Sequence, residues 1–510
     1  MMLESGELTL STLRAAYLNP VAVRLTPGDR TRVECAASLV DKIVATGDPI
    51  YGVNTGFGLL AQTRVPDGQL AQLQRNLVLS HAAGTGEALP DAIVRLVLLL
   101  KLNSLARGHS GVSIDLINTL ASMLEHEVYP VIPGQGSVGA SGDLAPLAHL
   151  AAALLGAGHV RVGGRVLPSG EGLARAGISQ MQFRPKEGLA LINGTQVSTA
   201  LVLAGLFGAE DVFGTALVTG AMSVDALMAS DVPFDGRIHA SRGQPGQIDV
   251  AAAYRQLLAG SEIRASHLSC PRIQDPYSFR CQPQVMGACL DLLRQAAATV
   301  AIEANAATDN PLIFAEDKEV LSGGNFHGEP IAFAADILAL ALAEIGSLSE
   351  RRVAVLVDPK MSGLPPFLVE NSGLNSGFMI AQVTAAALVS ENKALATPCS
   401  VDSIPTSANQ EDHVSMATHA ARRLMTMVDN AAGIVAIELL AAAQGIDFRR
   451  PARSSATLEE MHMAVRRDVP YYSSDRYFAP DIQIAKDWVR SGRFTKSVAR
   501  LLPSHQVHQQ

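Results

Sequence analysis

Residues 197–228 read VSTALVLAGLFGAEDVFGTALVTGAMSVDALM, an apolar stretch whose only charged residues are Glu210, Asp211 and Asp225. The stretch is several times longer than an ordinary β-strand, so it predicts a helix. Shorter apolar stretches of the same kind occupy residues 92–105, 331–348, 379–395 and 431–443. Helices that are apolar on most faces must be buried against other helices. The sequence therefore predicts a mainly α-helical protein, built on a bundle of long helices that oligomerises.

The composition agrees with close helix packing. Hydrophobic residues make up 48% of the chain and aromatic residues only 5%, so small and aliphatic side chains carry the hydrophobicity. Residues 331–348 approach the length of a membrane span, but Asp336 and Glu344 lie inside this stretch and a charged segment follows it. Charges are rare inside membrane spans, so we interpret the stretch as a buried bundle helix.

Strand signals are few and local. Residues 159–162 and 165–167 flank Gly163-Gly164, and residues 312–314 and 320–321 flank a charged turn, so each pair predicts a short β-hairpin. From Tyr471 onward the composition becomes more polar and aromatic. We predict three parts along the chain, which are an N-terminal domain (1–195), a central long-helix domain (196–470) and a C-terminal segment (471–510).

Charge and cysteine content narrow the functional classes. The chain has 40 Lys and Arg against 48 Asp and Glu, a net charge of −8 without long runs of one sign. This pattern favours neither nucleic acid nor a membrane as partner. The N-terminal residues Met-Met-Leu-Glu-Ser-Gly-Glu lack the basic and apolar regions of a signal peptide, so we expect a cytoplasmic protein. Five cysteines without a Cys-x-x-Cys pair predict neither a disulfide framework nor a zinc cluster.

The glycine-rich segment 134–143, GQGSVGASGD, allows two different chemistries. Gly134, Gly136 and Gly139 fit the G-x-G-x-x-G pattern of an NADP-dependent oxidoreductase. That pattern must follow a central strand, yet residues 128–133 contain two prolines. No acidic residue stands about twenty positions later to bind a ribose, although Arg161 could bind a 2′-phosphate. The surrounding chain also lacks alternating strands and helices, so this interpretation is disfavoured.

The second chemistry uses the peptide itself. If the Gly142 amide nitrogen attacks the Ala140 carbonyl carbon, a five-membered ring closes with loss of water. Elimination of the Ser141 hydroxyl then leaves a 4-methylidene-imidazol-5-one. Glycine leaves the approach open and alanine is small. The helix predicted from Asp143, with Asp143 as its cap, would place its positive end beside this electrophile. The triplet alone is weak evidence, since Ala-Ser-Gly arises by chance in about one chain of this length in five.

The longer string GSVGASGDLAPLAH at residues 136–149 resembles the signature of the aromatic amino acid ammonia-lyases. Further motifs similar to this family follow in family order: YGVNTGFG at 51–58, NGTQ at 193–196, QDPYSFR at 274–280, GNFH at 324–327 and SANQEDH at 407–413. Val53 in the first of these is a mild aliphatic departure. The resemblance implies a helical homotetramer of the fumarase and aspartase type, with active sites drawn from three subunits. It also implies a self-formed ring at Ala140, Ser141 and Gly142 and no exogenous cofactor.

The resemblance further implies roles in the removal of ammonia from an amino acid. The ring would accept the substrate amine. Tyr51 is the candidate base for the β-proton, and Tyr277 is a second candidate for proton transfer. Arg280 would clamp the substrate carboxylate through its two-pronged guanidinium group. Asn193 would donate to the ring carbonyl oxygen, where negative charge accumulates.

The resemblance also implies which residues would contact the side chain of the substrate. Phe326 is expected as an apolar wall and Gln274 as a further substrate-binding residue. Ser80-His81 and Glu411 resemble the histidine-specific members. Glu411 can accept from an imidazole N–H and His81 can complement the other nitrogen. The resemblance thus implies conversion of L-histidine to trans-urocanate and ammonia, with a phenylalanine or tyrosine ammonia-lyase, or an aminomutase, as the alternatives.

A metal site is not predicted. Glu411, His413 and His419 could in principle ligate a metal ion, but their spacing matches no common helical ligand pattern.

Overall fold

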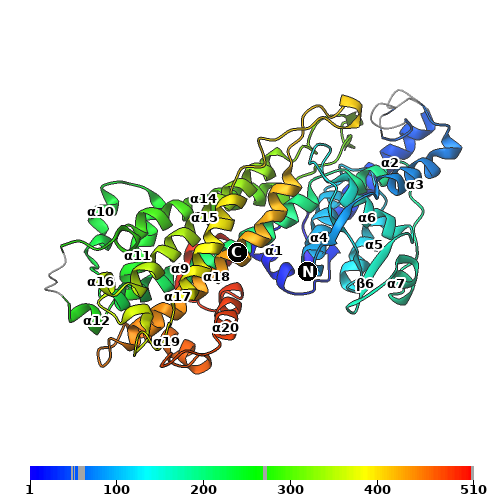
Figure 1. The fold of residues 1–510 in the computed structure, drawn as a ribbon. Helices are drawn as coiled ribbons and strands as arrows, with labels where there is room; N and C mark the ends of the chain where they lie inside the picture. The colour runs from blue at the N-terminus through cyan, green and yellow to red at the C-terminus, as the bar shows by residue number, and fades with distance from the viewer. Residues whose placement is uncertain (47–49, 51, 56–63, 268–272, 507–510) are drawn as a thin grey trace. The chain divides into compact units, whose positions relative to one another are not determined.

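The computed structural model describes residues 1–46, 50, 52–55, 64–267 and 273–506. The chain forms two compact units, and several long helices pass from one to the other. The first unit comprises Met1–Ala204, Ala297–Asp336 and Pro398–Arg422, and the second comprises Gly205–Ala296, Ile337–Thr397 and Arg423–Gln510. Helices dominate both units (Figure 1), so the predicted mainly α-helical fold is confirmed. The division into residues 1–195, 196–470 and 471–510 stays a prediction.

The first unit contains mostly short and medium helices. They are α1 (Leu10–Leu18), α2 (Pro27–Thr46), η2 (Asp67–Gln69), α3 (Leu70–His81), α4 (Asp91–Ala106), α5 (Ile114–Glu125), α6 (Leu144–Leu154), α7 (Ser169–Arg175), α8 (Glu187–Ile192) and η5 (Ser407–Asn409). Helix α4, predicted from residues 92–105, is buried along almost its entire length. It therefore forms the centre of this unit's core.

Short strands bridge loops of the first unit. They are β1 (Met2–Leu3), β2 (Arg24–Leu25), β3 (Thr85–Ala88), β4 (Tyr129–Pro130), β5 (Pro133–Gln135), β6 (His159–Val162), β7 (Arg165–Pro168), β8 (Leu312–Phe314) and β9 (Glu319–Leu321). The β6–β7 and β8–β9 pairs confirm the two predicted hairpins. Within the described ranges no sheet has more than three strands. The glycine-rich segment follows the three-residue strand β5 and has no β-α-β unit around it, so the dinucleotide-binding alternative is wrong.

The second unit is built on long helices. Four helices extend across the boundary between the units: α9 (Gln196–Leu227), α14 (Gln282–Ala304), α15 (Glu329–Val357) and α18 (Ala417–Asp447). The helices confined to the second unit are η3 (Val232–Phe234), α10 (Gly236–Ala240), α11 (Pro245–Leu258), α12 (Glu262–Ala265), α13 (Tyr277–Arg280), α16 (Pro359–Ser362), η4 (Pro366–Leu368), α17 (Met379–Leu395), α19 (Ala456–Asp468), α20 (Ala479–Arg490), η6 (Lys496–Leu501) and η7 (Pro503–His505).

Acidic side chains inside the apolar helices have defined partners. The carboxylate of Glu210 accepts hydrogen bonds from the backbone nitrogen and hydroxyl of Ser504, which anchors the chain's C-terminal part to α9. Asp225 accepts from Ser261 and Ser454, and its burial raises its pKa to about 6. These contacts show how the apolar stretch at 197–228 accommodates Glu210 and Asp225, because a buried carboxylate is costly unless it is hydrogen-bonded.

Four helices, α9, α14, α15 and α18, are long and apolar enough to cross a membrane by length and composition. The most apolar window is 94% buried inside the protein in α9, 78% in α18, 67% in α15 and 44% in α14. Packing within the chain therefore buries most of this window in α9, α18 and α15, which contains the stretch at 331–348, and less than half of it in α14.

Candidate active site

The segment that carries Ala140, Ser141 and Gly142 is a tight loop between β5 and α6. We call it the electrophile loop, after its predicted role. Gly142 has a φ of +72°, and a Cβ on it would lie 2.2 Å from the carbonyl oxygen of Gly194. No other residue type fits this position without moving the backbone. Ala140 is only 4% exposed and packs in a small cluster with Val414 and Met416. The loop is thus held in one conformation from both sides.

Asp143 anchors this loop to the rest of the first unit. Its fully buried carboxylate accepts from the Ser137 hydroxyl at 2.9 Å, from the Thr418 hydroxyl at 2.5 Å and from the nitrogen and hydroxyl of Ser198 at 2.7 and 2.9 Å. Asp143 is the N-cap residue of α6, as predicted, but its side chain makes no capping bond because these four contacts use its oxygens. Asp143 instead joins three segments that are far apart in sequence.

Both functional atoms of Ser141 are engaged. Its carbonyl oxygen accepts from Asn193 Nδ2 at 2.7 Å, and its hydroxyl donates to Glu411 Oε1. The first contact places an amide donor on the oxygen that would become the ring carbonyl. The second places a carboxylate against the hydroxyl that would leave. The structure therefore brings together three of the predicted site residues.

Glu411 is half-buried and held ionised. Burial by itself would raise the pKa of this carboxyl, but hydrogen bonds from the hydroxyls of Ser141, Thr406 and Ser407 and the charge of His81 together lower the pKa below its ordinary value. The Thr406 and Ser407 hydroxyls donate to Oε2 at 2.6 and 2.8 Å. Glu411 is thus an acceptor at neutral pH, suited to an N–H group.

His81 is the last residue of α3 and is partly buried, with its Nδ1 3.1 Å from the Ser80 hydroxyl. The chain after it is tied to the electrophile loop, because β3 pairs with β5. The nitrogen of Gly84 donates to Nε2 of His149 on α6 at 3.1 Å, and burial lowers the pKa of His149. A neutral His149 can accept this bond, so the segment after His81 is attached to α6 as well as to β5.

Lys101 is a contributor that sequence reasoning missed. It lies on α4, fully buried, and its ammonium group donates to the carbonyl oxygens of Ala190 at 3.1 Å and Asn193 at 2.8 Å. These bonds satisfy carbonyls at the end of α8 and fix the backbone of Asn193. Lys101 is the only cation in residues 96–106, and a lone charge in an apolar helix could have signalled it.

The buried Lys101 should make the stability of the protein depend on pH. Burial lowers its pKa from 10.5 to about 7, although Asp309 and Asp143 oppose the shift. Between these two values the unfolded chain binds about one more proton than the folded chain, so the free energy of unfolding rises with pH, by up to about 1.4 kcal/mol per pH unit. In Lys101→Met, which has no titratable group at this position, the free energy of unfolding should not rise with pH in this way. We expect the melting temperature of the parent protein to increase more, from about pH 7.5 to about pH 9, than that of the variant.

The matched control is Lys42→Met, which changes an exposed lysine of the same unit. It should keep the parent's pH dependence. Identical pH dependence in Lys101→Met and the parent would contradict the assignment.

Gln274, Tyr277 and Arg280 lie together in the second unit. Tyr277 and Arg280 are the two ends of the short helix α13, and the guanidinium carbon of Arg280 is 5.6 Å from the centre of the Tyr277 ring. An Arg280 nitrogen donates to Gln274 Oε1. Tyr277 is 72% exposed. These residues thus form an accessible group in the second unit that can bind a carboxylate.

Two further residues were predicted for the site, Tyr51 and Phe326. Tyr51 lies outside the described residues, but its neighbours Val53 and Asn54 are fully buried, and Asn54 accepts from the nitrogen of Ile50 at 2.8 Å. Phe326 is partly exposed in the turn before α15. That turn is attached to the electrophile loop, since the nitrogen of Gly328 donates to the carbonyl oxygen of Gly139 at 3.0 Å. Phe326 is therefore carried by a segment in contact with the loop.

Comparison with known proteins agrees with this arrangement. The profile of the aromatic amino acid lyases matches residues 8–467. The chain belongs to the aromatic amino acid lyase family. It is 60% identical over 505 residues to a histidine ammonia-lyase of Aromatoleum aromaticum, covering 99% of this chain and 96% of the relative.

Solved structures extend the comparison to the fold. The structure of a histidine ammonia-lyase from Trypanosoma cruzi superposes with a TM-score of 0.92 at 40% identity, covering 100% of this chain and 98% of the other. A tyrosine aminomutase from Streptomyces globisporus superposes with a TM-score of 0.91 at 37% identity, covering 97% and 98%. The same fold thus supports more than one substrate, so the substrate must be argued from side chains.

Proposed function

We propose that this chain catalyses the elimination of ammonia from L-histidine to give trans-urocanate, the first step of histidine degradation, and that it does so in the cytoplasm. The observation that carries the proposal is the ionised Glu411, which contacts Ser141 and interacts with His81. An imidazole ring offers one N–H and a second nitrogen, which this pair complements. Once the Ser141 hydroxyl has been eliminated, a phenyl ring would leave Oε1 of the half-buried Glu411 without the donor that an imidazole N–H supplies.

The residues at 140–142 fit a self-formed 4-methylidene-imidazol-5-one. The left-handed Gly142 has no room for a Cβ, and the Ser141 carbonyl already has its amide donor in Asn193. When formed, the group supplies an electron-poor methylidene carbon that accepts the substrate amine. Asn193 stabilises negative charge on the adjacent oxygen, at the present distance of 2.7 Å.

The remaining roles concern binding and proton transfer. Arg280 binds the substrate carboxylate with two parallel hydrogen bonds, which fixes the orientation of the α-carbon. Gln274, its present partner, assists at the same carboxylate, and Phe326 limits the pocket on its apolar side. Tyr51 and Tyr277 are the two candidates for removing the β-proton. As a phenol, either one needs a nearby cation or donor to act near neutral pH.

The direct test offers the purified protein L-histidine, L-phenylalanine and L-tyrosine separately. Only L-histidine should give an ultraviolet-absorbing product together with ammonia. A product from tyrosine but not from histidine would overturn the proposed substrate. A β-amino acid in place of the unsaturated acid would identify an aminomutase.

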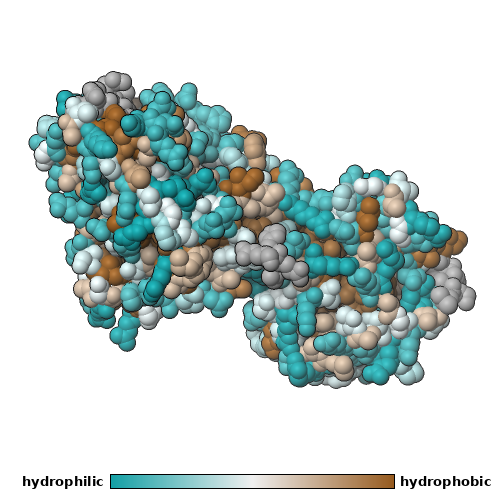
Figure 2. All heavy atoms as spheres, turned by 180° about the vertical axis from the view of Figure 1, so that it is seen from behind, coloured by the Kyte–Doolittle hydropathy of each residue, from teal (hydrophilic) through white to brown (hydrophobic). Residues whose placement is uncertain are grey.

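We also propose a homotetramer whose active sites are shared between subunits. Large apolar side chains remain exposed on the second unit of a single chain, including Leu340 on α15 and Ile380 and Val383 on α17. Figure 2 shows hydrophobic patches scattered among hydrophilic atoms on one face of the chain. Exposed apolar helix faces of this kind are typical of surfaces that bury each other in oligomers.

Sharing of sites predicts complementation between two inactive chains. Ser141→Ala removes the electrophile and Arg280→Met removes the carboxylate clamp, so each variant alone should be inactive. If Ser141 and Arg280 of one site come from different subunits, co-expression of both variants should restore about a quarter of the parent activity, as random mixing predicts. Activity of the purified mixed oligomers measures this. No recovery in oligomers shown to contain both chains would contradict the shared site.

A further inference from the structure

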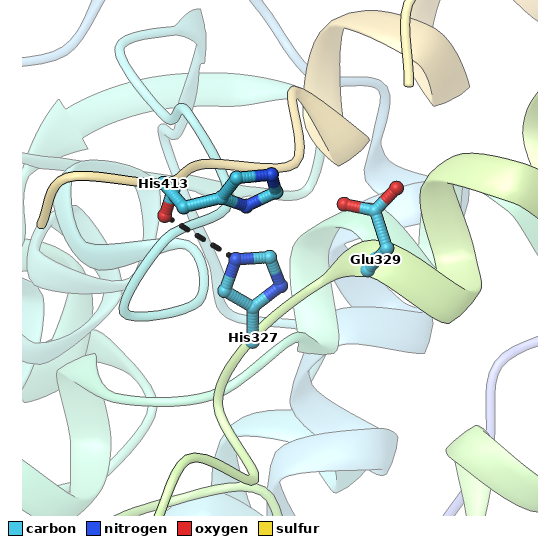
Figure 3. Close-up of side chains that lie close together, drawn as sticks. All are labelled: His327, Glu329 and His413. Atoms are coloured by element: carbon cyan, nitrogen blue, oxygen red, sulfur yellow. Dashed lines mark hydrogen bonds between the residues drawn. The ribbon is translucent and has the colours of Figure 1, made fainter. Parts of the chain in front are cut away.

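Three side chains of the first unit converge beside the electrophile loop without a role in the proposed reaction. They are His327, which precedes α15, Glu329, the first residue of α15, and His413, two residues after Glu411. One potential ligand atom from each lies within 4.8 Å of those of the other two. Figure 3 shows the Glu329 carboxylate beside the two imidazole rings, whose centres are 5.6 Å apart.

We propose that His327, Glu329 and His413 form a binding site for a divalent cation of the Zn²⁺ type. Two imidazoles and one carboxylate are a known protein ligand set for zinc, and they leave a fourth position open. Tetrahedral zinc places its ligand atoms about 3.4 Å apart, given bond lengths of about 2.1 Å. The three atoms lie within 4.8 Å of one another, so binding an ion would draw the side chains closer by up to about 1.4 Å.

The carboxylate of Glu329 gives a second, independent indication of a bound cation. Glu329 Oε2 is shielded from solvent, and among the described residues no donor lies within hydrogen-bonding distance of it. A buried carboxylate oxygen without a partner is costly, and it is rare in folded proteins. The start of α15 favours a negative charge through the helix dipole, but the dipole gives Oε2 no specific partner. A cation held between Glu329 and the two histidines would give it one.

His327 makes a contact of the kind that metal-bound histidines commonly make. Nε2 of His327 lies 3.3 Å from the carbonyl oxygen of His413. With the proton on Nε2, this nitrogen donates to the carbonyl oxygen and Nδ1 keeps its lone pair for a metal. Metal-bound histidines commonly donate their second nitrogen to a backbone carbonyl in this way. The contact also ties the two ligand-bearing segments together before any ion binds.

A bound ion would affect the substrate pocket by holding two segments that line it in fixed positions. It would join the start of α15, next to Phe326, to the segment that carries Glu411. Both residues are expected to line the side-chain pocket. The metal site itself does not depend on the proposed substrate, because its test measures binding of the ion alone.

The test uses tag-free protein, stripped of metal with a chelator and dialysed, and titrated with ZnCl₂ in the absence of histidine. Isothermal titration calorimetry should show one tight site per chain. His327→Gln and His413→Gln should each weaken that site at least about a hundredfold, since changes even to outer partners of metal ligands weaken binding ten- to a hundredfold. His413 is exposed, so its variant should fold normally, and circular dichroism checks this.

The matched control is His419→Gln, which removes an exposed histidine of the same unit outside the cluster and should leave binding unchanged. Co²⁺ provides a second measurement, because tetrahedral Co²⁺ absorbs visible light. The parent protein should show this absorption, and His413→Gln should lack it. No tight Zn²⁺ binding by the parent, or equal binding by the parent and both cluster variants, would overturn the proposal.

Discussion

Ser141→Ala is expected to lower kcat/KM for L-histidine by at least about a thousandfold, equal to about 4 kcal/mol of transition-state stabilisation. Alanine has no β-hydroxyl to eliminate, so the methylidene carbon cannot form. The parent chain should be about 36 Da lighter than its sequence mass, by two waters, whereas the variant can lose at most one. Intact mass spectrometry measures this difference.

The fold of the variant should be unchanged, because the Ser141 hydroxyl hydrogen-bonds only Glu411 among the described residues. Ser241→Ala, at an exposed serine of the second unit, is the control and should keep both the mass loss and the activity. Full activity in Ser141→Ala, or a parent chain at its full sequence mass, would refute the self-formed ring.

Glu411→Gln has the second-largest expected effect. The substitution keeps the shape but removes the charge that accepts the imidazole N–H, and it should lower kcat/KM for L-histidine by about a hundred- to a thousandfold, or about 3 to 4 kcal/mol. Because Glu411 also contacts the Ser141 hydroxyl, intact mass is measured alongside the kinetics. A variant that has lost two waters but binds histidine poorly isolates the substrate role.

Asp412→Asn tests whether charge in this segment matters in general. Asp412 is the exposed neighbour of Glu411, so its variant should behave like the parent protein. If Glu411→Gln forms the ring and also retains the parent's kcat/KM, then Glu411 does not recognise the imidazole.

Much of the fold could be predicted because it is encoded locally. The stretch at 379–395 coincides with α17, and that at 197–228 differs from α9 by one residue at each end. Helix α18 begins at Ala417, well before the predicted stretch at 431–443. The apolar pattern does not predict its first turns, because they carry polar residues such as Thr418 and Arg423. These side chains are buried by tertiary contacts, which an apolar pattern does not reveal.

The site could be predicted only in part. Ser141, Asn193 and Glu411 were identified by resemblance, and the structure brings them into contact. The sequence does not reveal the four contacts of Asp143 or the support of Asn193 by Lys101, because all the partners except Ser137 lie tens to hundreds of residues away. The cluster at 327, 329 and 413 was missed for the same reason, since local spacing carries no information about pairs 86 residues apart.

The anchoring of Asp143 has a consequence for biosynthesis. Thr418, one of its partners, is 275 residues further along the chain, and Glu411 follows Ser141 by 270. A nascent polypeptide that ends before these residues lacks the contacts that constrain the Ala140–Gly142 backbone. We therefore expect the reactive alkene to arise after the ribosome has passed codon 418, once most of the chain has been synthesised. This order would limit the exposure of an unfinished chain's own electrophile to cellular thiols and amines.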